Sequence, residues 1–99
     1  MDINREIRQA VDTGKVILGS DKSVKSVKLG QAKLVILASN CPDAVRSDVE
    51  HHAKLANIPI YTYEGDSLAL GLACGKPFLV SIAAVLEPGS SGILSIRGK

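Results

Sequence analysis

The sequence predicts a three-layer α/β/α sandwich with a four-stranded mixed β-sheet, formed by a single domain over residues 1–99. Two features predict this fold. Short runs of apolar residues alternate with segments whose apolar residues recur at helical spacing. Glycine or proline separates most of these segments, and no repeat or linker interrupts them. With 99 residues, 45% of them hydrophobic, the chain can bury one core without disulfides or a metal ion.

The first predicted helix and strand occupy residues 2–18. Asp2 can cap the helix, and Gly14 suits the left-handed conformation at its end. The apolar residues on one face of this helix are Ile3, Ile7, Ala10 and Val11. The apolar run 15–18, which ends at Gly19, is expected to be a strand buried on both faces.

A second helix and the clearest strand follow. The helix carries Val24, Val27 and Lys28 and is expected to end at Gly30. The residues that could cap its start are Ser20, Asp21 and Ser23. Residues 34–38 are a continuous apolar run, which predicts a buried strand.

A third helix and strand are predicted next. Pro42 suits the first position of the helix, Asp43 lies near its positive end, and Pro59 closes it. The residues expected to face inward are Val45, Val49, Ala53 and Ala56. Residues 60–63 are expected to form the strand.

The last helix is short and is expected to be capped by Asp66 or Ser67. Its inward residues are predicted to be Leu68, Leu72 and Ala73. The final core strand is predicted over residues 79–86, and a turn or short helical segment over 88–92.

Several classes of protein are disfavoured by the composition. No apolar run approaches the roughly 18 residues of a membrane span, and the N-terminus lacks the features of a secretory signal, so a soluble, cytoplasmic protein is expected. Cys41 and Cys74 are expected to be buried free thiols. His51 and His52 would project in different directions from a helix, which disfavours a metal site. We expect no cofactor and no enzymatic activity, since no carboxylate pair or nucleophile elbow is present.

The net charge is only +2, but the charges are unevenly distributed. Between Lys15 and Lys33 there are five lysines and a single acid, Asp21. Between Asp43 and Asp66 the balance is reversed, with five acids against two basic residues. One region of the fold is therefore expected to be cationic, as a surface for a polyanion would be.

The loop of residues 19–23 combines glycine, small hydroxyl residues and lysine at a strand-to-helix junction. Free backbone N–H groups and the helix dipole favour a phosphate at such a point, and Lys22 and Lys25 supply countercharge. The alternative is that Gly19 only makes the turn and the lysines are simply solvated. The residues of this loop do not decide between the two, and the P-loop pattern is absent.

Two further polar segments are candidates for the same surface. Asn40 follows the clearest strand and could present a donor and an acceptor to a base edge, although asparagine is also a common turn residue. Gly75, Lys76 and Phe78 precede the last strand, and Phe78 could be exposed for stacking or buried in the core. All three loops share one sheet edge only if the last strand is antiparallel, which implies a mixed sheet.

The sequence closely resembles the archaeal and eukaryotic family of large-subunit ribosomal protein thirty. The segments that carry the resemblance are Val16-Ile17-Leu18-Gly19, Lys22-Ser23-Val24-Lys25, Gly30, residues 32–38, Asn40-Cys41-Pro42, Glu50, Ala53-x-Leu55, Leu70-Gly71, Cys74-Gly75-Lys76 and Pro88-Gly89. They cover essentially the whole chain with unchanged spacing. The resemblance implies an α/β/α sandwich that recognises kink-turn RNA, a sharply bent internal loop flanked by tandem sheared G·A pairs.

The resemblance also implies which residues meet the RNA. These are Gly19, Ser20, Asp21, Lys22, Ser23 and Lys25 after the first strand, Asn40 after the second, and Gly75, Lys76, Phe78, Leu79 and Val80 before the last. Lys28 and Lys33 are expected to add countercharge to the phosphates crowded at the bend. Two departures stand out: Asp21 replaces a basic residue, and no arginine follows Phe78.

The leading hypothesis is a structural protein of the large ribosomal subunit that binds an rRNA kink-turn. Other ribosomal components are expected as partners, a membrane is not, and the isolated protein is expected to be a monomer. One alternative is a kink-turn protein of a guide-RNA particle, whose relatives carry an Arg/Gly-x-Asn-Glu loop where this chain has Gly-Ser-Asp-Lys-Ser. The other is a protein-interaction adaptor of the same fold, which the lysine cluster disfavours.

Overall fold

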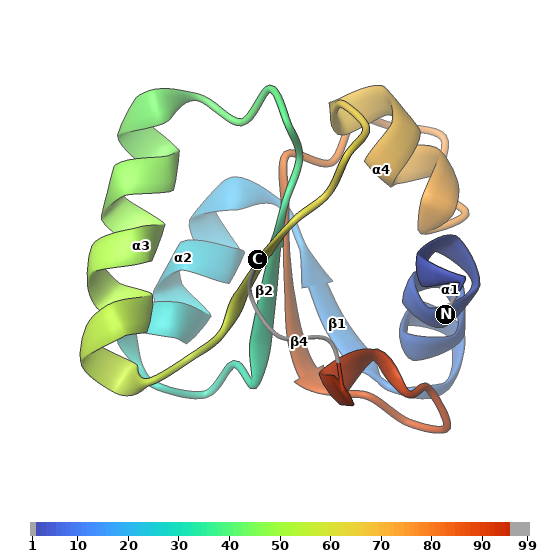
Figure 1. Cartoon of the computed structure of the whole chain (residues 1–99), viewed down its shortest axis with the longest axis horizontal. Coiled ribbons are helices and arrows are strands. Elements are labelled where there is room, and N and C mark those ends of the chain that lie inside the picture. Colours follow the sequence, from blue (N-terminus) through green and yellow to red (C-terminus); the bar gives the residue numbers. More distant parts are fainter. Residues whose placement is uncertain (1, 96–99) are drawn as a thin grey trace.

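The computed structural model describes residues 2–95 as a four-stranded sheet with helices on both faces (Figure 1). The elements are α1 (Ile3–Thr13), β1 (Lys15–Leu18), α2 (Ser20–Lys28), β2 (Leu34–Leu37), α3 (Asp43–Ala56), β3 (Ile60–Thr62), α4 (Ser67–Ala73), β4 (Ile82–Glu87) and the 3₁₀ helix η1 (Ile93–Ser95). The strand order is β1-β4-β2-β3. Strands β2 and β3 are parallel, whereas β4 runs antiparallel to both of its neighbours, which confirms the predicted mixed sheet.

Two hydrophobic cores lie on opposite faces of the sheet. Successive strand residues point to opposite faces, so Ile36 packs under α1 and α4, whereas Val35 and Leu37 pack under α2 and α3 (Figure 1). Every residue of β2 is buried, as predicted for a strand covered on both sides. The same prediction for β1 was wrong. That strand lies at the sheet edge beside β4 alone, and none of its residues is fully buried.

The helix ends differ from the prediction in four places. Gly14, at the end of α1, is extended with φ −113° and ψ −154° and not left-handed, because a Cβ-free residue is needed there for close packing against the Glu87 carbonyl oxygen. No side chain caps α2, whose N-cap residue is Gly19. Pro42 is the N-cap of α3 rather than its first residue. The same helix ends at Asn57, in the left-handed conformation with φ 58°, and Ala56 is exposed instead of facing inward. Asn57 can adopt this conformation at modest cost, so α3 stops before Pro59 is reached.

The inward face of α4 was predicted wrongly for its leucines, although Ala73 packs against the core as predicted. Leu70 is buried against α1 and the sheet, whereas Leu68 and Leu72 are exposed. The helix has only seven residues and is apolar on all sides, so apolar spacing could not identify its inner face. Its capping by Asp66 was predicted correctly, since the Asp66 carboxylate accepts a hydrogen bond from the Ala69 N–H at 2.9 Å.

The last strand begins at Ile82 rather than at residue 79. The preceding residues pack along α4 instead, where the Val80 N–H donates to the Ser67 carbonyl oxygen at 3.0 Å. Strand β3 is similarly one residue shorter than predicted and ends at Thr62. Within residues 2–95 there is no helix with the length and apolar character needed to cross a membrane.

Candidate nucleic-acid interface

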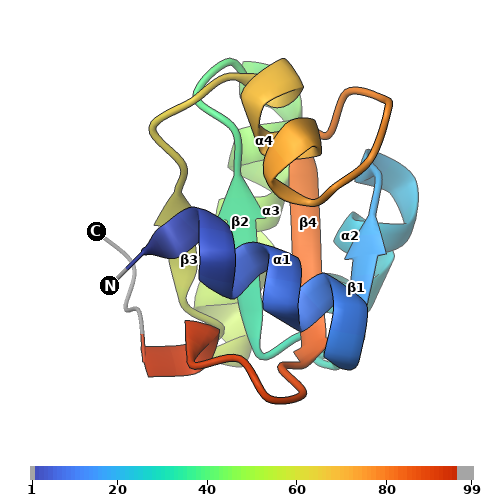
Figure 2. The same cartoon turned by 90° about the vertical axis from the view of Figure 1, so that its right-hand side faces the viewer.

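Three chain segments meet where β1 and β2 end and β4 begins, at the upper end of the sheet in Figure 2. We call this end the carboxyl edge. The Gly19 N–H donates to the Ile82 carbonyl oxygen at 3.2 Å, and the Ala38 N–H donates to the Ser81 carbonyl oxygen at 2.9 Å. The antiparallel direction of β4 therefore brings its leading loop beside the two loops that leave β1 and β2, as the sequence predicted.

The first of these loops passes directly into α2 at Gly19. Its backbone has φ 120° and ψ 149°, a conformation restricted essentially to glycine. A Cβ atom at Gly19 would meet nothing within 4 Å, so the requirement comes from the backbone conformation and not from crowding.

The start of α2 is suited to an anion. The N–H groups of Ser20, Asp21 and Lys22 have no acceptor within the helix, and no side chain caps them. Their partial positive charges add to the helix dipole and favour a phosphate oxygen at this end. Asp21 and Lys22 are both exposed here, so the local charge is mixed.

Ser23 does not belong to this surface. Its side chain is fully buried, and its Oγ donates to the Ile17 carbonyl oxygen at 3.1 Å. Ser23 therefore fastens α2 to β1, and an RNA molecule cannot reach its hydroxyl. The prediction that it contacts RNA is corrected because the helix turns this residue toward the sheet.

Asn40 lies at the carboxyl edge, and its amide is held by the start of α4. The Oδ1 atom accepts from the Ser67 N–H at 2.8 Å, and Nδ2 donates to the Ser67 Oγ at 3.3 Å. An amide has two N–H donors and an oxygen with two lone pairs, so one N–H and one lone pair remain. Asn40 is exposed, so these remaining groups face solvent in a fixed orientation.

The loop before β4 presents apolar side chains. Phe78 is 52% exposed and Leu79 is 64% exposed, which answers the question that the sequence left open for Phe78. Val80 is only 1% exposed and packs in the core, so its predicted contact with RNA is corrected. Gly75 and Lys76 lie at the start of this loop, where Gly75 has φ 75°.

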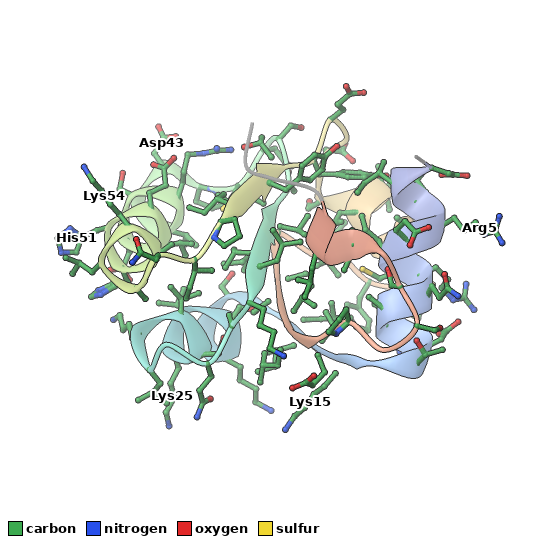
Figure 3. All side chains as sticks on the ribbon, turned by 60° about the horizontal axis from the view of Figure 1, so that its bottom comes forward. Arg5, Lys15, Lys25, Asp43, His51 and Lys54 are labelled. Carbon is green, nitrogen blue, oxygen red and sulfur yellow. The ribbon has the colours of Figure 1, made fainter. Side chains whose placement is uncertain are left out.

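The lysines are distributed over more than one part of the molecule. Among residues 2–95, Lys22 and Lys25 form no ion pair, and Figure 3 shows Lys25 extending from α2 away from the sheet. Lys28, at the far end of α2, pairs with Asp48 at 3.7 Å. Lys33 precedes β2 and pairs with Glu87 at 3.3 Å at the opposite end of the sheet. The structure thus does not bring Lys33 to the carboxyl edge.

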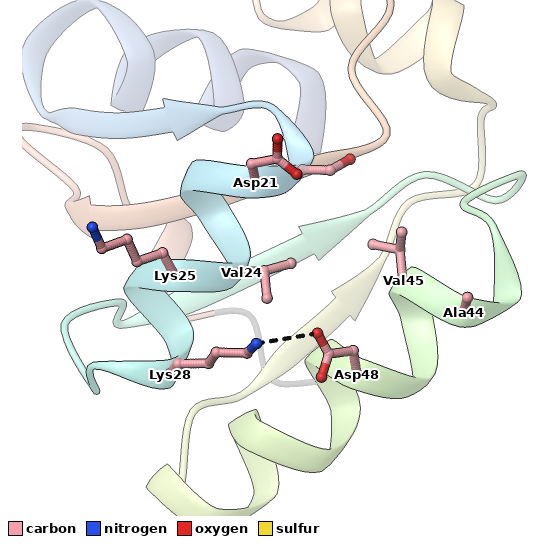
Figure 4. Close-up of a pocket in the computed structure, with 8 residues that line it drawn as sticks. Asp21, Val24, Lys25, Lys28, Ala44, Val45 and Asp48 are labelled. Atoms are coloured by element: carbon pink, nitrogen blue, oxygen red, sulfur yellow. Dashed lines mark ion pairs between the residues drawn. The ribbon is translucent and has the colours of Figure 1, made fainter.

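A groove of about 450 Å³ between α2 and α3 was not predicted. Figure 4 shows its lining, with Val24 and Val45 from the two facing helices and the Lys28–Asp48 ion pair across one end. Asp21 and Lys25 belong to the same lining. Only the packing of two helices creates such a groove, so no local sequence pattern could have indicated it.

The two thiols are buried and free, as predicted. Burial raises the pKa of Cys74 to about 11 and also raises the pKa of Cys41. Neither thiol is therefore a ready nucleophile at neutral pH. The described residues hold no group of three His, Cys, Asp or Glu side chains able to bind a metal ion.

The fold and the carboxyl edge define a class: a small α/β/α domain whose exposed lysines and free helix N–H groups suit a polyanion. Comparison with known proteins identifies the family. Residues 1–95 match the Ribosomal protein L7Ae/L30e/S12e/Gadd45 family, and the chain belongs to this family.

Three curated relatives illustrate the similarity, and each is named large ribosomal subunit protein eL30. The protein from Methanosphaera stadtmanae is 55% identical over 97 residues, which cover 98% of this chain and 99% of that protein. The protein from Methanothermobacter thermautotrophicus is 54% identical, covering 99% of this chain and 100% of the relative. The protein from Methanocaldococcus jannaschii is 53% identical, and the match covers 100% of this chain and 90% of that protein. The resemblance seen in the sequence is thus confirmed.

Proposed function

We propose that this chain is a structural constituent of the large ribosomal subunit and that it binds a kink-turn in rRNA through its carboxyl edge. The name shared by the archaeal relatives supports the ribosomal role. One observation carries the RNA site: the uncapped start of α2, the oriented amide of Asn40 and the exposed ring of Phe78 converge on one edge. Each of these groups suits a different part of an RNA molecule.

Each of these three groups recognises a different part of the RNA. The N–H groups at the start of α2, with Lys22 and Lys25, neutralise phosphates and fix the position of the backbone. The remaining N–H and lone pair of Asn40 read a base edge. Phe78 covers a base that the bend has displaced from its stack.

Binding then acts on RNA shape and not through chemistry. A kink-turn RNA exchanges between an extended and a bent form, and crowded phosphates disfavour the bent one. A protein that contacts only the bent form shifts the population toward it by its differential affinity. Asp21 limits the surface, because its exposed carboxylate accepts hydrogen bonds from base amino groups but repels phosphate.

A gel shift with kink-turn RNA, compared with the same RNA after replacement of its G·A pairs, tests this proposal. The wild-type protein should bind the kink-turn RNA at least about tenfold more tightly. Equal affinity for both RNAs, or no binding to either, would contradict it.

Variants of Asn40 test its assigned role in the same assay. Asn40→Asp keeps an acceptor for the Ser67 N–H but removes the amide donor, so it should lose discrimination between the two RNAs while remaining folded. Ser67→Ala is the matched control, because it removes only the hydroxyl that accepts from Asn40 Nδ2. If Asn40→Asp discriminates as well as the wild type, Asn40 does not read a base edge.

A further inference from the structure

An exposed apolar surface lies next to the proposed RNA site and is not used by it in full. It consists of Leu68 and Leu72 of α4 with Phe78 and Leu79 of the following loop, and we call it the leucine patch. The exposed fractions of Leu68 and Leu72 are 55% and 65%. Four of the six large apolar side chains exposed among residues 2–95 belong to this patch.

The backbone geometry holds the four side chains together. Leu68 and Leu72 are four residues apart and therefore lie on the same face of α4. The loop runs alongside this helix, because Val80 donates to the Ser67 carbonyl oxygen and a Cβ atom at Gly71 would be only 2.1 Å from the Phe78 carbonyl oxygen. Figure 2 shows the loop returning past α4 toward β4.

The composition of α4 indicates that its outer face is covered in the working state of the protein. Leu70 fills the core on the inner side, while Leu68 and Leu72 occupy the outer side, so the helix is apolar all round. Helices of this kind are normally buried on all sides. Here only one side of α4 is buried by the chain itself.

The size of the patch argues against a second copy of the chain as its occupant. Four such side chains expose on the order of 400 Å², whereas a stable interface buries about 800 Å² on each partner. The patch is large enough for an additional contact inside an assembly that other contacts hold together.

Its chemistry argues for protein over RNA. Leucine side chains have no donor, acceptor or charge, whereas RNA presents phosphates, hydroxyls and polar base edges. Only Phe78 of the four has a ring on which a base could stack. The patch also borders the carboxyl edge, since Ser67 contacts both Asn40 and the backbone of Val80.

We propose that Leu68 and Leu72, the part of the leucine patch that the RNA site does not use, dock an apolar segment of a neighbouring protein within the same ribosomal particle. This partner lies beside the RNA and contacts this chain only when both are assembled. The placement beside RNA rests on the proposed function, whereas the need for an apolar partner rests on α4 and its loop alone.

The test compares two binding reactions of the full chain. One uses isolated kink-turn RNA, and the other uses large ribosomal subunits that were purified from an archaeon and stripped of the homologous protein. The double variant Leu68→Gln/Leu72→Gln should bind the stripped subunits roughly tenfold more weakly than wild type, because it removes an apolar contact. Its affinity for the isolated RNA should stay within about twofold. Leu55→Gln, at a 72% exposed leucine on α3, is the matched control and should change neither reaction.

A photoreactive phenylalanine analogue at Leu72, introduced into the stripped subunits, identifies the occupant. A cross-link to a ribosomal protein supports the proposal. A cross-link to rRNA, a cross-link to a second copy of the chain, or unchanged binding of the double variant to the subunits would overturn it. If the wild type fails to bind isolated kink-turn RNA, the proposed function fails, and the subunit reaction still reports on the patch. Thermal unfolding of the double variant should match wild type, since both leucines are exposed.

Discussion

The two ends of the sheet differ in whether their charged side chains form ion pairs. At the end away from the carboxyl edge, Lys33 is paired with Glu87 at 3.3 Å. The backbone is also tightly packed there, since a Cβ atom at Gly14 would lie 2.1 Å from the Glu87 carbonyl oxygen. At the carboxyl edge, Lys22 forms no ion pair with any residue from 2 to 95, and neither does Lys25 further along α2. The far end of the sheet is therefore closely packed with its lysine paired, whereas the carboxyl edge leaves helix N–H groups and a lysine charge exposed.

This difference separates residues that hold the fold together from residues that are available for binding. Asn40 combines the two roles in one side chain. One N–H and one lone pair of its amide bind Ser67 and orient the side chain, and the other N–H and lone pair are available for binding.

The largest effect on stability is expected from Gly71→Ala. The new Cβ atom would lie 2.1 Å from the Phe78 carbonyl oxygen, so the loop must move away from α4. The free energy of unfolding should fall by about 3 kcal/mol, and kink-turn RNA affinity should fall with it. Gly30→Ala is the control, because its Cβ meets nothing within 4 Å and only its φ of +70° is unfavourable, at about 1 kcal/mol. Urea unfolding that finds equal losses for both would contradict the close packing of the loop on α4.

High pH should destabilise the protein by ionising the buried thiol of Cys74, which follows α4. The pKa of Cys74 is raised by burial from 9.0 to about 11, so the folded state favours the neutral thiol. The resulting stabilisation is complete below pH 9 and is lost as the pH rises from 9 toward 11, by about 2–3 kcal/mol. Cys74→Ala should lack this component of the pH dependence in urea unfolding. If the unfolding free energy of Cys74→Ala falls with pH as steeply as that of wild type, Cys74 is not the source of the pH dependence.

Phe78→Ala should separate binding from stability. The ring is half exposed, so its loss should change the free energy of unfolding by less than about 0.5 kcal/mol. RNA binding should weaken by about 1–3 kcal/mol if a base stacks on the ring. Fluorescence anisotropy with labelled kink-turn RNA measures this, and unchanged affinity would remove Phe78 from the site.

The smallest effects are expected from two lysines, and they compare the two ends of the sheet directly. Lys25→Ala should weaken RNA binding and lower the slope of log affinity against log salt by about 1, because one phosphate contact is lost. Lys33→Ala should leave that slope unchanged and cost at most about 0.5 kcal/mol of stability, since it breaks only an exposed ion pair. A salt titration in which the two variants behave alike would contradict the assignment of binding to one end.

Much of the fold could be predicted because its signals are local. Continuous apolar runs marked β1 and β2, and the antiparallel direction of β4 followed from the need to bring three loops together. The orientation of α4 could not be predicted, because every side of that helix is apolar and the decision rests on the close approach of Gly71 to the Phe78 backbone. That approach is a packing contact between the helix and the loop that follows it, and apolar spacing within α4 does not reveal it.

The sequence predicted that the three loops of the candidate site lie together, and the structure confirms this, but several of the predicted residues do not face that surface. Ser23 and Val80 lie within the expected loops, but tertiary packing turns both side chains inward. Lys33 was grouped with the other lysines by its position in the sequence, yet β2 begins at the opposite end of the sheet. The hydrogen bonds between Asn40 and Ser67 join residues 27 positions apart, so no local sequence pattern predicts them.

The most direct test of the central claim is a titration of the isotopically labelled protein with kink-turn RNA, followed by NMR of its backbone amides. The account predicts that the largest shifts fall on residues 19–22, 39–41, 75–76 and 78–79. Amides of residues 31–33, 57–58 and 87 and 89, at the opposite end of the sheet, should change little. Shifts concentrated at that opposite end, or spread evenly over both, would contradict an RNA site at the carboxyl edge.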